Sequence, residues 1–325
     1  MAKHGNYTSE KVRFPSHGET LAGVVYRPKG DGPFPAVVTL GPYSFEKEQA
    51  PVHYSTRLAD EGFVALAFDP RTVGESSGEP RRLENPKMKN EDAVAALDYL
   101  TGRADVDPSR VFALGVCQGG PQLLDIASYD GRIKAVASVT GYYRDDETDR
   151  FMIAAGVVLN PFDPATAPTT AQLEALKAAR LERAREAKEL YETSGEVVYR
   201  PLVSPDLGDP VEGSDAGLPG PLVWSWYGPW TLKGWENRYA VLSDLDHFGY
   251  TTVPGVANLR TPALVVHGDS CMNPPSAKRH FESIPTPDKK LVWDNDVNHF
   301  QYYDQPDVVD RAAGLAADWF REHGA

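Results

Sequence analysis

Stretches of apolar residues alternate with amphipathic segments through the first half of the chain. After two short strands at Lys11–Phe14 and Leu21–Arg27, the nearly continuous apolar stretches are Ala36–Leu40, Phe63–Phe68, Arg110–Val116 and Ile133–Val139. The segments between them have helical spacing, at Glu48–Glu61, Asn90–Thr101 and Gly119–Ser128. Strands that are apolar on both faces belong to parallel sheets covered by helices on both sides. The pattern predicts an α/β fold with a mostly parallel, doubly wound sheet.

This alternation stops near Gly141 and resumes after Asn258. One long helix is predicted at Ala171–Glu192, and aromatic residues and prolines follow it. The closing elements are again strands and helices, at Pro262–His267, Ser276–Ser283, Lys290–Trp293 and Asp307–Glu322. We expect a core of residues 1–144 and 259–325, with residues 145–258 inserted as a helical cap that shapes a substrate pocket at the carboxyl ends of the strands. The alternative is a helical lobe that packs separately and takes no part in catalysis.

Charge and composition exclude several classes of partner. The chain has 33 basic and 46 acidic residues, a net charge of −13, so a nucleic-acid partner is not expected. The apolar stretches fall far short of the roughly 18 residues that span a membrane, and Met1–Phe14 lacks the apolar core of a signal peptide. There are only two cysteines, Cys117 and Cys271. We therefore expect a cytoplasmic protein without a disulfide framework and without a membrane partner.

Motifs for cofactors are missing from the sequence. It contains no G-x-G-x-x-G motif, no P-loop and no histidine pair at a metal-binding spacing. We expect no cofactor and no metal, and a small-molecule substrate as the partner.

The most informative motif is Gly115-Val116-Cys117-Gln118-Gly119, at the junction of a predicted strand and a predicted helix. The pattern G-x-nucleophile-x-G is typical of a nucleophile elbow, whose central residue has a strained backbone and whose glycines avoid collisions with neighbouring segments. Cysteine stands in place of the usual serine, and the helix N-terminus is expected to favour its thiolate. In the alternative interpretation, Cys117 is a buried and unreactive side chain in a tight turn.

A thiol nucleophile needs a base, which in this architecture follows the last strand. His299 lies in the loop after Lys290–Trp293, so we predict that it is the general base. Two donors are expected to hold the oxyanion: the backbone N–H of Gln118, and Tyr43 through its backbone N–H or its phenol. The intervening Pro42 has no N–H and cannot donate.

Together these residues resemble the cysteine-type α/β-hydrolases of the dienelactone-hydrolase-like family, and the resemblance implies an α/β-hydrolase fold. It extends over the segments Leu21-Ala22-Gly23, Tyr26-Arg27-Pro28, Lys47-Glu48-Gln49, Gly74–Pro80 and Asp107–Val111, the cysteine elbow, and His299 with Tyr302, Tyr303 and Asp304. The pair Pro42-Tyr43 is also similar to the cocaine-esterase and X-prolyl-peptidase branch, in which the tyrosine hydroxyl helps to form the oxyanion hole.

The resemblance leaves the acid of the catalytic triad open. In most α/β-hydrolases the acid lies three residues after the glycine that follows the penultimate core strand, and counting from Gly268 that position is Cys271. We favour Asp269, ahead of Asp294 and Asp296, as the acid. Glu46 is similar to a glutamate that contacts the resting thiol in dienelactone-hydrolase-like enzymes. A cysteine–histidine dyad without an acid is the remaining option, because a thiol needs less activation than a hydroxyl.

These residues predict a hydrolase that cleaves an ester, lactone or thioester through an acyl-enzyme on Cys117, with His299 as base. Plain amides are not favoured. The aromatic residues of the cap favour an apolar or ring-containing substrate. The same acyl-enzyme would serve an acyltransferase or cyclase if an amine or hydroxyl replaced water. A non-catalytic binding protein on the same fold is the third hypothesis, and it predicts that Cys117 is inert.

Overall fold

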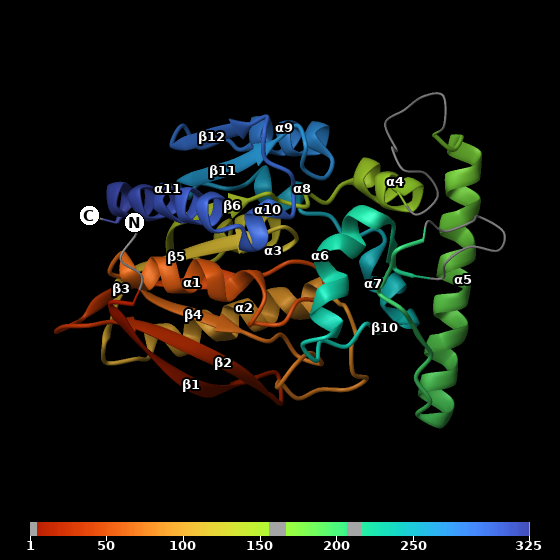
Figure 1. Ribbon diagram of the computed structural model, residues 1–325, viewed down its shortest axis with the longest axis horizontal. Coiled ribbons are helices and arrows are strands. Elements are labelled where there is room, and N and C mark those ends of the chain that lie inside the picture. The colour runs from red at the N-terminus through yellow and green to blue at the C-terminus, as the bar shows by residue number, and fades with distance from the viewer. Residues whose placement is uncertain (1–4, 156–166, 207–215, 325) are drawn as a thin grey trace. The chain divides into compact units, whose positions relative to one another are not determined.

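A computed structural model describes residues 5–155, 167–206 and 216–324 of the chain (Figure 1). The chain divides into two compact units. The first contains residues 1–78, 87–144 and 251–325, and the second contains residues 79–86 and 145–250. The second unit therefore includes a short segment, Glu79–Pro86, that lies outside the expected insertion.

The first unit is built on a sheet of eight strands in the order β1-β2-β4-β3-β5-β6-β11-β12. Their bounds are β1 Tyr7–Ser16, β2 Glu19–Pro28, β3 Phe34–Leu40, β4 Val64–Phe68, β5 Val106–Val116, β6 Ile133–Val139, β11 Ala263–Gly268 and β12 Lys289–Asp294. Only β2 runs antiparallel to both of its neighbours, β1 and β4, and the strands from β4 to β12 are parallel. The predicted doubly wound, mostly parallel α/β sheet is confirmed.

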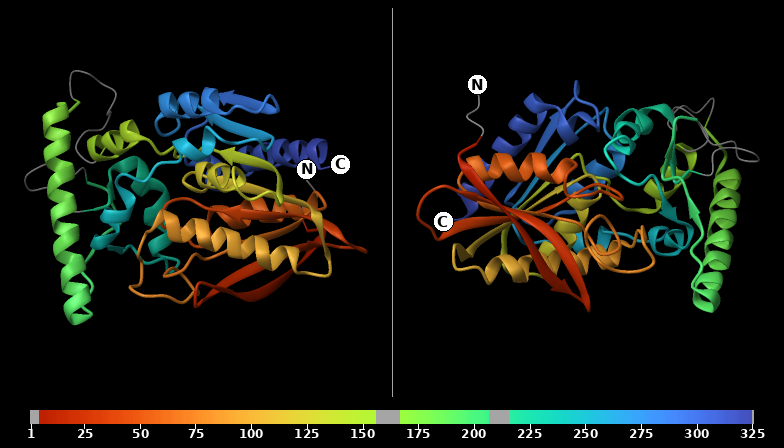
Figure 2. Two further views of the ribbon diagram at one scale, coloured as in Figure 1. Left: turned by 180° about the vertical axis from the view of Figure 1, so that it is seen from behind. Right: turned by 60° about the horizontal axis from the view of Figure 1, so that its bottom comes forward.

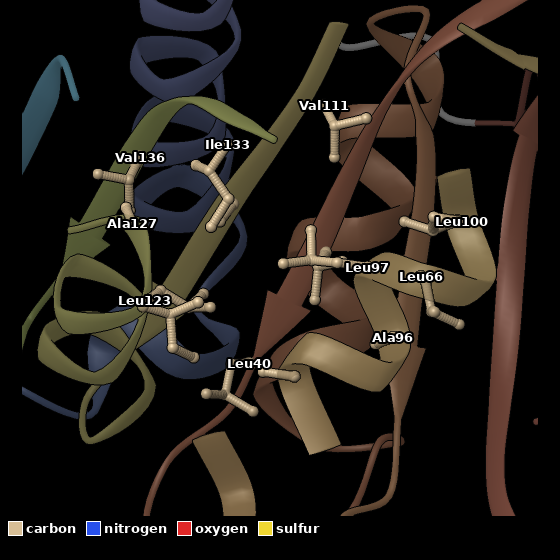
Figure 3. Close-up of a cluster of buried hydrophobic side chains, with 14 of the residues drawn as sticks. Leu40, Leu66, Ala96, Leu97, Leu100, Val111, Leu123, Ala127, Ile133 and Val136 are labelled. Atoms are coloured by element: carbon tan, nitrogen blue, oxygen red, sulfur yellow. The ribbon is translucent and has the colours of Figure 1, made fainter. Parts of the chain in front are cut away.

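Helices cover both faces of this sheet. Alternate residues of each strand point to opposite faces, so Val111 and Ala113 of β5 join one core while Phe112 joins the other. The first core includes α2 (Pro86–Thr101) and α3 (Gly119–Ala127), as Figure 3 shows. On the opposite face, α1 (Ala50–Asp60) lies beside α11 (Pro306–His323) (Figure 2). Phe112 stacks there on Phe320 of α11.

Three short helices complete the first unit: α8 (Val253–Val256), α9 (Pro274–Ser283) and α10 (Gln301–Asp304). Helix α8 packs against α3, and a Cβ atom at Gly255 would lie 1.8 Å from an Asp125 oxygen. This close contact explains why residues 251–258, which we expected in the insertion, belong to the core unit.

The second unit consists mainly of helices: α4 (Asp146–Ala155), α5 (Thr170–Ser194), α6 (Pro221–Thr231), the 3₁₀ turn η1 (Val241–Ser243) and α7 (Asp244–His247). Its strands are two residues long: β7 Tyr199–Arg200, β8 Val203–Ser204, β9 Leu218–Pro219 and β10 Tyr239–Ala240. The long helix expected at Ala171–Glu192 is α5, which begins with a Thr169–Gln172 capping box and ends at a left-handed Gly195.

A buried carboxylate ties α5 to the rest of the second unit. Asp244 accepts hydrogen bonds from Arg180 of α5 at 3.0 and 3.1 Å, from Arg200 at 2.7 Å and from the Tyr239 hydroxyl at 2.9 Å. The two guanidinium groups hold the pKa of Asp244 below its ordinary value despite its burial. Because α5 buries only Ala184 and Ala187 fully, this ion cluster is a main attachment of the helix. Among the described residues, no helix is long and apolar enough to cross a membrane.

Candidate active site

Cys117 lies in the sharp turn between β5 and α3, as the motif predicts. Its φ of 55° is left-handed, a conformation that residues other than glycine rarely adopt and that is common at catalytic turns. Two backbone hydrogen bonds fix the turn: Cys117 N–H donates to Val139 O at 3.0 Å, and Gly119 N–H donates to Gly41 O at 3.1 Å. The side chain is only 3% exposed.

The elbow glycines are required by the close approach of backbone segments. A Cβ atom at Gly115 would lie 2.2 Å from the Gly119 carbonyl carbon and oxygen, and one at Gly119 would lie 2.3 Å from Leu40 O.

We predict that Gly115→Ala lowers the free energy of unfolding by about 3 kcal/mol, because backbone atoms would have to move. Gly131→Ala is the control, since a Cβ there meets nothing within 4 Å and should change stability by less than about 0.5 kcal/mol. Urea denaturation of both variants measures the difference, and equal stabilities would contradict the prediction.

Three donors converge on the Cys117 sulfur. They are the backbone N–H groups of Tyr43 and Gln118 and the hydroxyl of Tyr303. Tyr43 thus acts on the sulfur through its backbone rather than its phenol. In this resting arrangement the sulfur accepts hydrogen bonds from the two N–H groups that we expected to hold an oxyanion.

Burial dominates the ionisation of the nucleophile. It raises the pKa of the Cys117 thiol to about 11, although the three donors and the Lys89 ammonium act in the opposite direction. The helix N-terminus was expected to favour the thiolate, but desolvation outweighs the helix and the donors. The resting side chain is a neutral thiol and depends on a base.

This neutral thiol predicts a particular pH dependence of alkylation. Only the thiolate reacts with iodoacetamide, so the rate at Cys117 should rise about tenfold per pH unit between pH 7 and 9.5 without a plateau. The rate is measured by mapping the labelled peptide, and the same protein unfolded in urea is the control, with a plateau near the ordinary thiol pKa. A plateau below pH 8 in the folded protein would show that the thiol is already ionised.

His299 lies between β12 and α10 and is 1% exposed. Its Nε2 is 3.0 Å from the Tyr303 hydroxyl, whose single proton can be donated either to Nε2 or to the Cys117 sulfur. Its Nδ1 is 2.8 Å from Thr140 Oγ1 and accepts the Met272 N–H at 3.2 Å. Burial, with a smaller contribution from His267, lowers the pKa of His299 well below its ordinary value. His299 is therefore neutral at pH 7, as a general base must be.

The carboxylate that we favoured as the triad acid has other partners. Asp269 is 58% exposed, accepts Trp293 Nε1–H at 3.0 Å and lies 3.9 Å from Lys278. Asp294 accepts from Tyr302 and Arg311. Within the described parts of the chain, neither these carboxylates nor Asp296 or Glu46 is hydrogen-bonded to the His299 ring. We therefore correct the assignment of Asp269 as the acid that orients His299, because the Asp269 side chain points outward from the loop.

Two residues at the site were not singled out as functional by the sequence. Tyr303 follows His299 by four positions, so one helical turn brings its hydroxyl beside the imidazole. Thr140 directly follows β6, the neighbour of the nucleophile strand β5. Cys271, at the usual address of the acid, accepts a hydrogen bond from Thr140, and burial raises the pKa of its thiol to about 11. Over the described ranges, no group of three histidine, cysteine or acidic side chains could hold a metal ion.

This strand order, with a nucleophile elbow after β5 and a histidine after the last strand, defines an α/β-hydrolase. The model of the X-Pro dipeptidyl-peptidase (S15) family matches residues 17–294. The chain belongs to this family and is an α/β-hydrolase enzyme. This is the peptidase branch to which Pro42-Tyr43 is similar. The crystal structure of the α/β-hydrolase GrgF from Penicillium sp. sh18 has the same fold, with a TM-score of 0.77 and 20% identity over 97% of this chain and 99% of that one.

Relatives with named activities match different lengths of the chain. The quorum-quenching protein AidA of Acinetobacter baumannii is 27% identical over 90% of this chain and 88% of its own length. Two shorter matches cover less than half of each protein. The thiohydrolase apmlB of Arthrinium phaeospermum is 33% identical over 40% of this chain and 42% of its own, and the acyltransferase drtE of Aspergillus calidoustus is 31% identical over 42% and 44%.

Proposed function

We propose that the chain is a cysteine-type hydrolase that cleaves an ester, lactone or thioester through an acyl-enzyme on Cys117. The observation that carries this proposal is the convergence of the Tyr43 and Gln118 N–H groups and the Tyr303 hydroxyl on one buried sulfur. The same hydroxyl lies 3.0 Å from His299 Nε2, which connects the sulfur to a neutral base. A structural cysteine would need none of these contacts.

The first step moves one proton and forms one bond. For this step the Tyr303 hydroxyl turns its single proton from the sulfur to His299 Nε2, 3.0 Å away, and accepts a hydrogen bond from the thiol on its oxygen. The thiol proton then passes to the Tyr303 oxygen while the Tyr303 proton passes to Nε2, and the sulfur electron pair attacks the substrate carbonyl carbon. The carbonyl oxygen becomes an oxyanion and takes the hydrogen bonds of Tyr43 and Gln118 that the resting sulfur had accepted. When the oxyanion collapses, the bond to the leaving group breaks and that group receives the proton from His299.

Water completes the cycle. His299 removes a proton from a water molecule, whose oxygen attacks the thioester carbonyl and releases the acid together with the Cys117 thiolate. The thiolate recovers its proton from His299 through Tyr303. The reaction needs no cofactor in this scheme, and each proton is returned.

The substrate is proposed to be a small molecule with an activated carbonyl. A thiolate is a better nucleophile for esters and thioesters than for plain amides, and the relative named as a thiohydrolase supports this class. We place the chain with the dienelactone-hydrolase-like members of the fold for the same reason. The aromatic side chains of the second unit, such as Trp226 and Trp235, favour an apolar or ring-containing substrate if this unit acts as a cap.

Acyl transfer is the second candidate, favoured by the relative named as an acyltransferase. It uses the same acyl-enzyme but replaces water by an amine or a hydroxyl. Incubation with a panel of small esters, lactones and thioesters, with and without added amine or alcohol, separates the two by their products. Free acid under all conditions supports hydrolysis, and amide or ester formed at the expense of acid supports transfer. No turnover of any member by the folded protein would contradict both.

The link between thiol and base predicts an effect of Tyr303→Phe. Loss of this hydroxyl removes the donor to the sulfur and the proton path to His299, so kcat should fall about 10-fold to 100-fold. Tyr302→Phe is the matched control, because the adjacent hydroxyl donates to Asp294 instead. Steady-state kinetics of both variants test the prediction. An equal loss of kcat in the two variants would mean that Tyr303 acts only through packing.

A further inference from the structure

His299 can take a proton at Nε2 only if its own proton is on Nδ1, because a neutral imidazole carries one proton on one of two nitrogens. We propose that Thr140 is the positioning residue that holds this proton, in the place that a carboxylate occupies in other triads. This inference deepens the proposed function and rests on Cys117 and His299 forming the reacting pair.

The geometry of Thr140 supports the assignment. Thr140 Oγ1 lies 2.8 Å from His299 Nδ1, and the side chain is fully buried. The backbone is left-handed, with φ of 44°, which is an outlier for a β-branched residue. A backbone hydrogen bond from Thr140 N–H to Val266 O at 2.7 Å holds it there. Strain of this kind persists at functional sites, and Cys117 at the end of the neighbouring strand has it too.

The second partner of Nδ1 shows why a hydroxyl is needed. Met272 N–H donates to Nδ1 at 3.2 Å and can never accept. Alone, this donor would keep the proton on Nε2, facing Tyr303, and such an imidazole cannot receive the thiol proton there. A threonine hydroxyl both donates and accepts, so Thr140 can receive Nδ1–H when Nε2 must be free.

The Thr140 proton has another acceptor, which leaves its oxygen available. Thr140 donates to the thiol sulfur of Cys271, the residue at the usual address of the acid. In the tautomer with Nδ1–H, in which Nδ1 no longer accepts from Met272 N–H, the path runs from His299 Nδ1–H to the Thr140 oxygen and from the Thr140 hydroxyl to the Cys271 sulfur. Within the described residues, no carboxylate takes part in it. A neutral hydroxyl in this position stabilises the imidazolium less than a carboxylate would.

Three substitutions at one position test the assignment. Thr140→Val keeps the shape but removes the hydroxyl, and we expect kcat to fall about 100-fold with little change in KM. Thr140→Ser restores the hydroxyl and should return activity to within about threefold. Thr140→Asp supplies an acceptor that tolerates left-handed backbone, and should keep activity while moving the acidic limb of the pH–rate profile upward by about one unit. The thiols of Cys117 and Cys271 do not contribute to that limb, because burial raises the pKa of each to about 11. A shift between the Thr140 variants is assigned to His299, whose Nδ1 lies 2.8 Å from Thr140 Oγ1, whereas the Nε2 of His267 lies 3.2 Å from Gly141 O.

A spectroscopic measurement separates this inference from the proposed function. In ¹⁵N-histidine NMR, the neutral His299 ring should carry its proton on Nε2 in Thr140→Val and on Nδ1 in Thr140→Asp. This readout needs no substrate, so it stands even if Cys117 forms no acyl-enzyme. Wild-type activity in Thr140→Val would overturn the inference. If that variant does not fold, a Thr140→Asp protein with an unchanged pH profile and with the His299 proton on Nε2 would overturn it.

Discussion

Cys117→Ala should lose at least about 10⁴-fold in kcat/KM toward any ester or thioester that the wild-type protein cleaves. The variant keeps the oxyanion donors Tyr43 and Gln118, but nothing remains to form the covalent intermediate. Its fold should be unchanged, because alanine removes one atom from a turn that backbone hydrogen bonds hold. Rates are measured with an activated ester, alongside thermal unfolding to exclude loss of structure.

The second cysteine provides the comparison. Cys271 lies beside Thr140 and not among the donors of Tyr43 and Gln118, so Cys271→Ala should still form a covalent adduct with substrate. A folded Cys117→Ala variant with more than about a tenth of wild-type activity would contradict the nucleophile assignment. In that case the motif would be only a tight turn, and the binding-protein hypothesis would gain support.

His299→Ala should lower kcat by about 10³-fold to 10⁴-fold, the second largest effect that we expect. The reason is the neutral resting thiol: with a pKa of about 11, almost none of Cys117 is ionised at pH 7 without a base. Because the remaining reaction depends on spontaneous ionisation, the residual rate should rise steeply with pH. The pH–rate profile of the variant between pH 7 and 9.5 measures both effects.

His17→Asn is the control for this substitution. His17 is an exposed turn residue with φ of 46°, a conformation that asparagine tolerates, and it lies at the β1–β2 turn far along the chain from the site. Its activity should equal that of the wild type. A His299→Ala variant with an unchanged pH profile would show that the thiol is activated by another group.

The sheet could be predicted because its signals are local. Apolar stretches such as Ala36–Leu40 and Phe63–Phe68 have no polar face, which requires helices on both sides, and the structure has them. The elbow was predictable for the same reason, since Gly115, Cys117 and Gly119 lie within five positions and the turn itself requires them. The role of His299 was predicted from its position, because the base of this architecture follows the last strand.

The rest of the site depends on contacts between distant segments. Thr140 and His299 meet only because β6 and the loop after β12 end at the same edge of the sheet, and no pattern around Thr140 signals a role. Asp269 was favoured for its position in the sequence, but its side chain direction is set by Trp293 and Lys278. The state of the Cys117 thiol was also not predictable, because the helix position is a local feature and the degree of burial is not.

The boundaries of the inserted unit show the same limit. The long helix α5 was predicted from composition, and its capping residues Thr169 and Gly195 fit that prediction. The short strands β7 to β10 escaped notice because two-residue strands leave no periodic pattern. Segment Glu79–Pro86 joins this unit through contacts such as Glu84 N–H with Ser243 Oγ at 2.9 Å, which the order of the chain does not reveal.

The nucleophile is tested most directly by trapping the intermediate. Wild-type protein is mixed with an equal amount of a small thioester or activated ester, quenched in acid at short times, and analysed by intact mass and peptide mapping. We predict one acyl group, bound as a thioester to the peptide that contains Cys117, formed before steady-state turnover and missing in Cys117→Ala. An acyl group on any other residue, or product formation by Cys117→Ala at the wild-type rate, would contradict the assignment of Cys117 as the nucleophile.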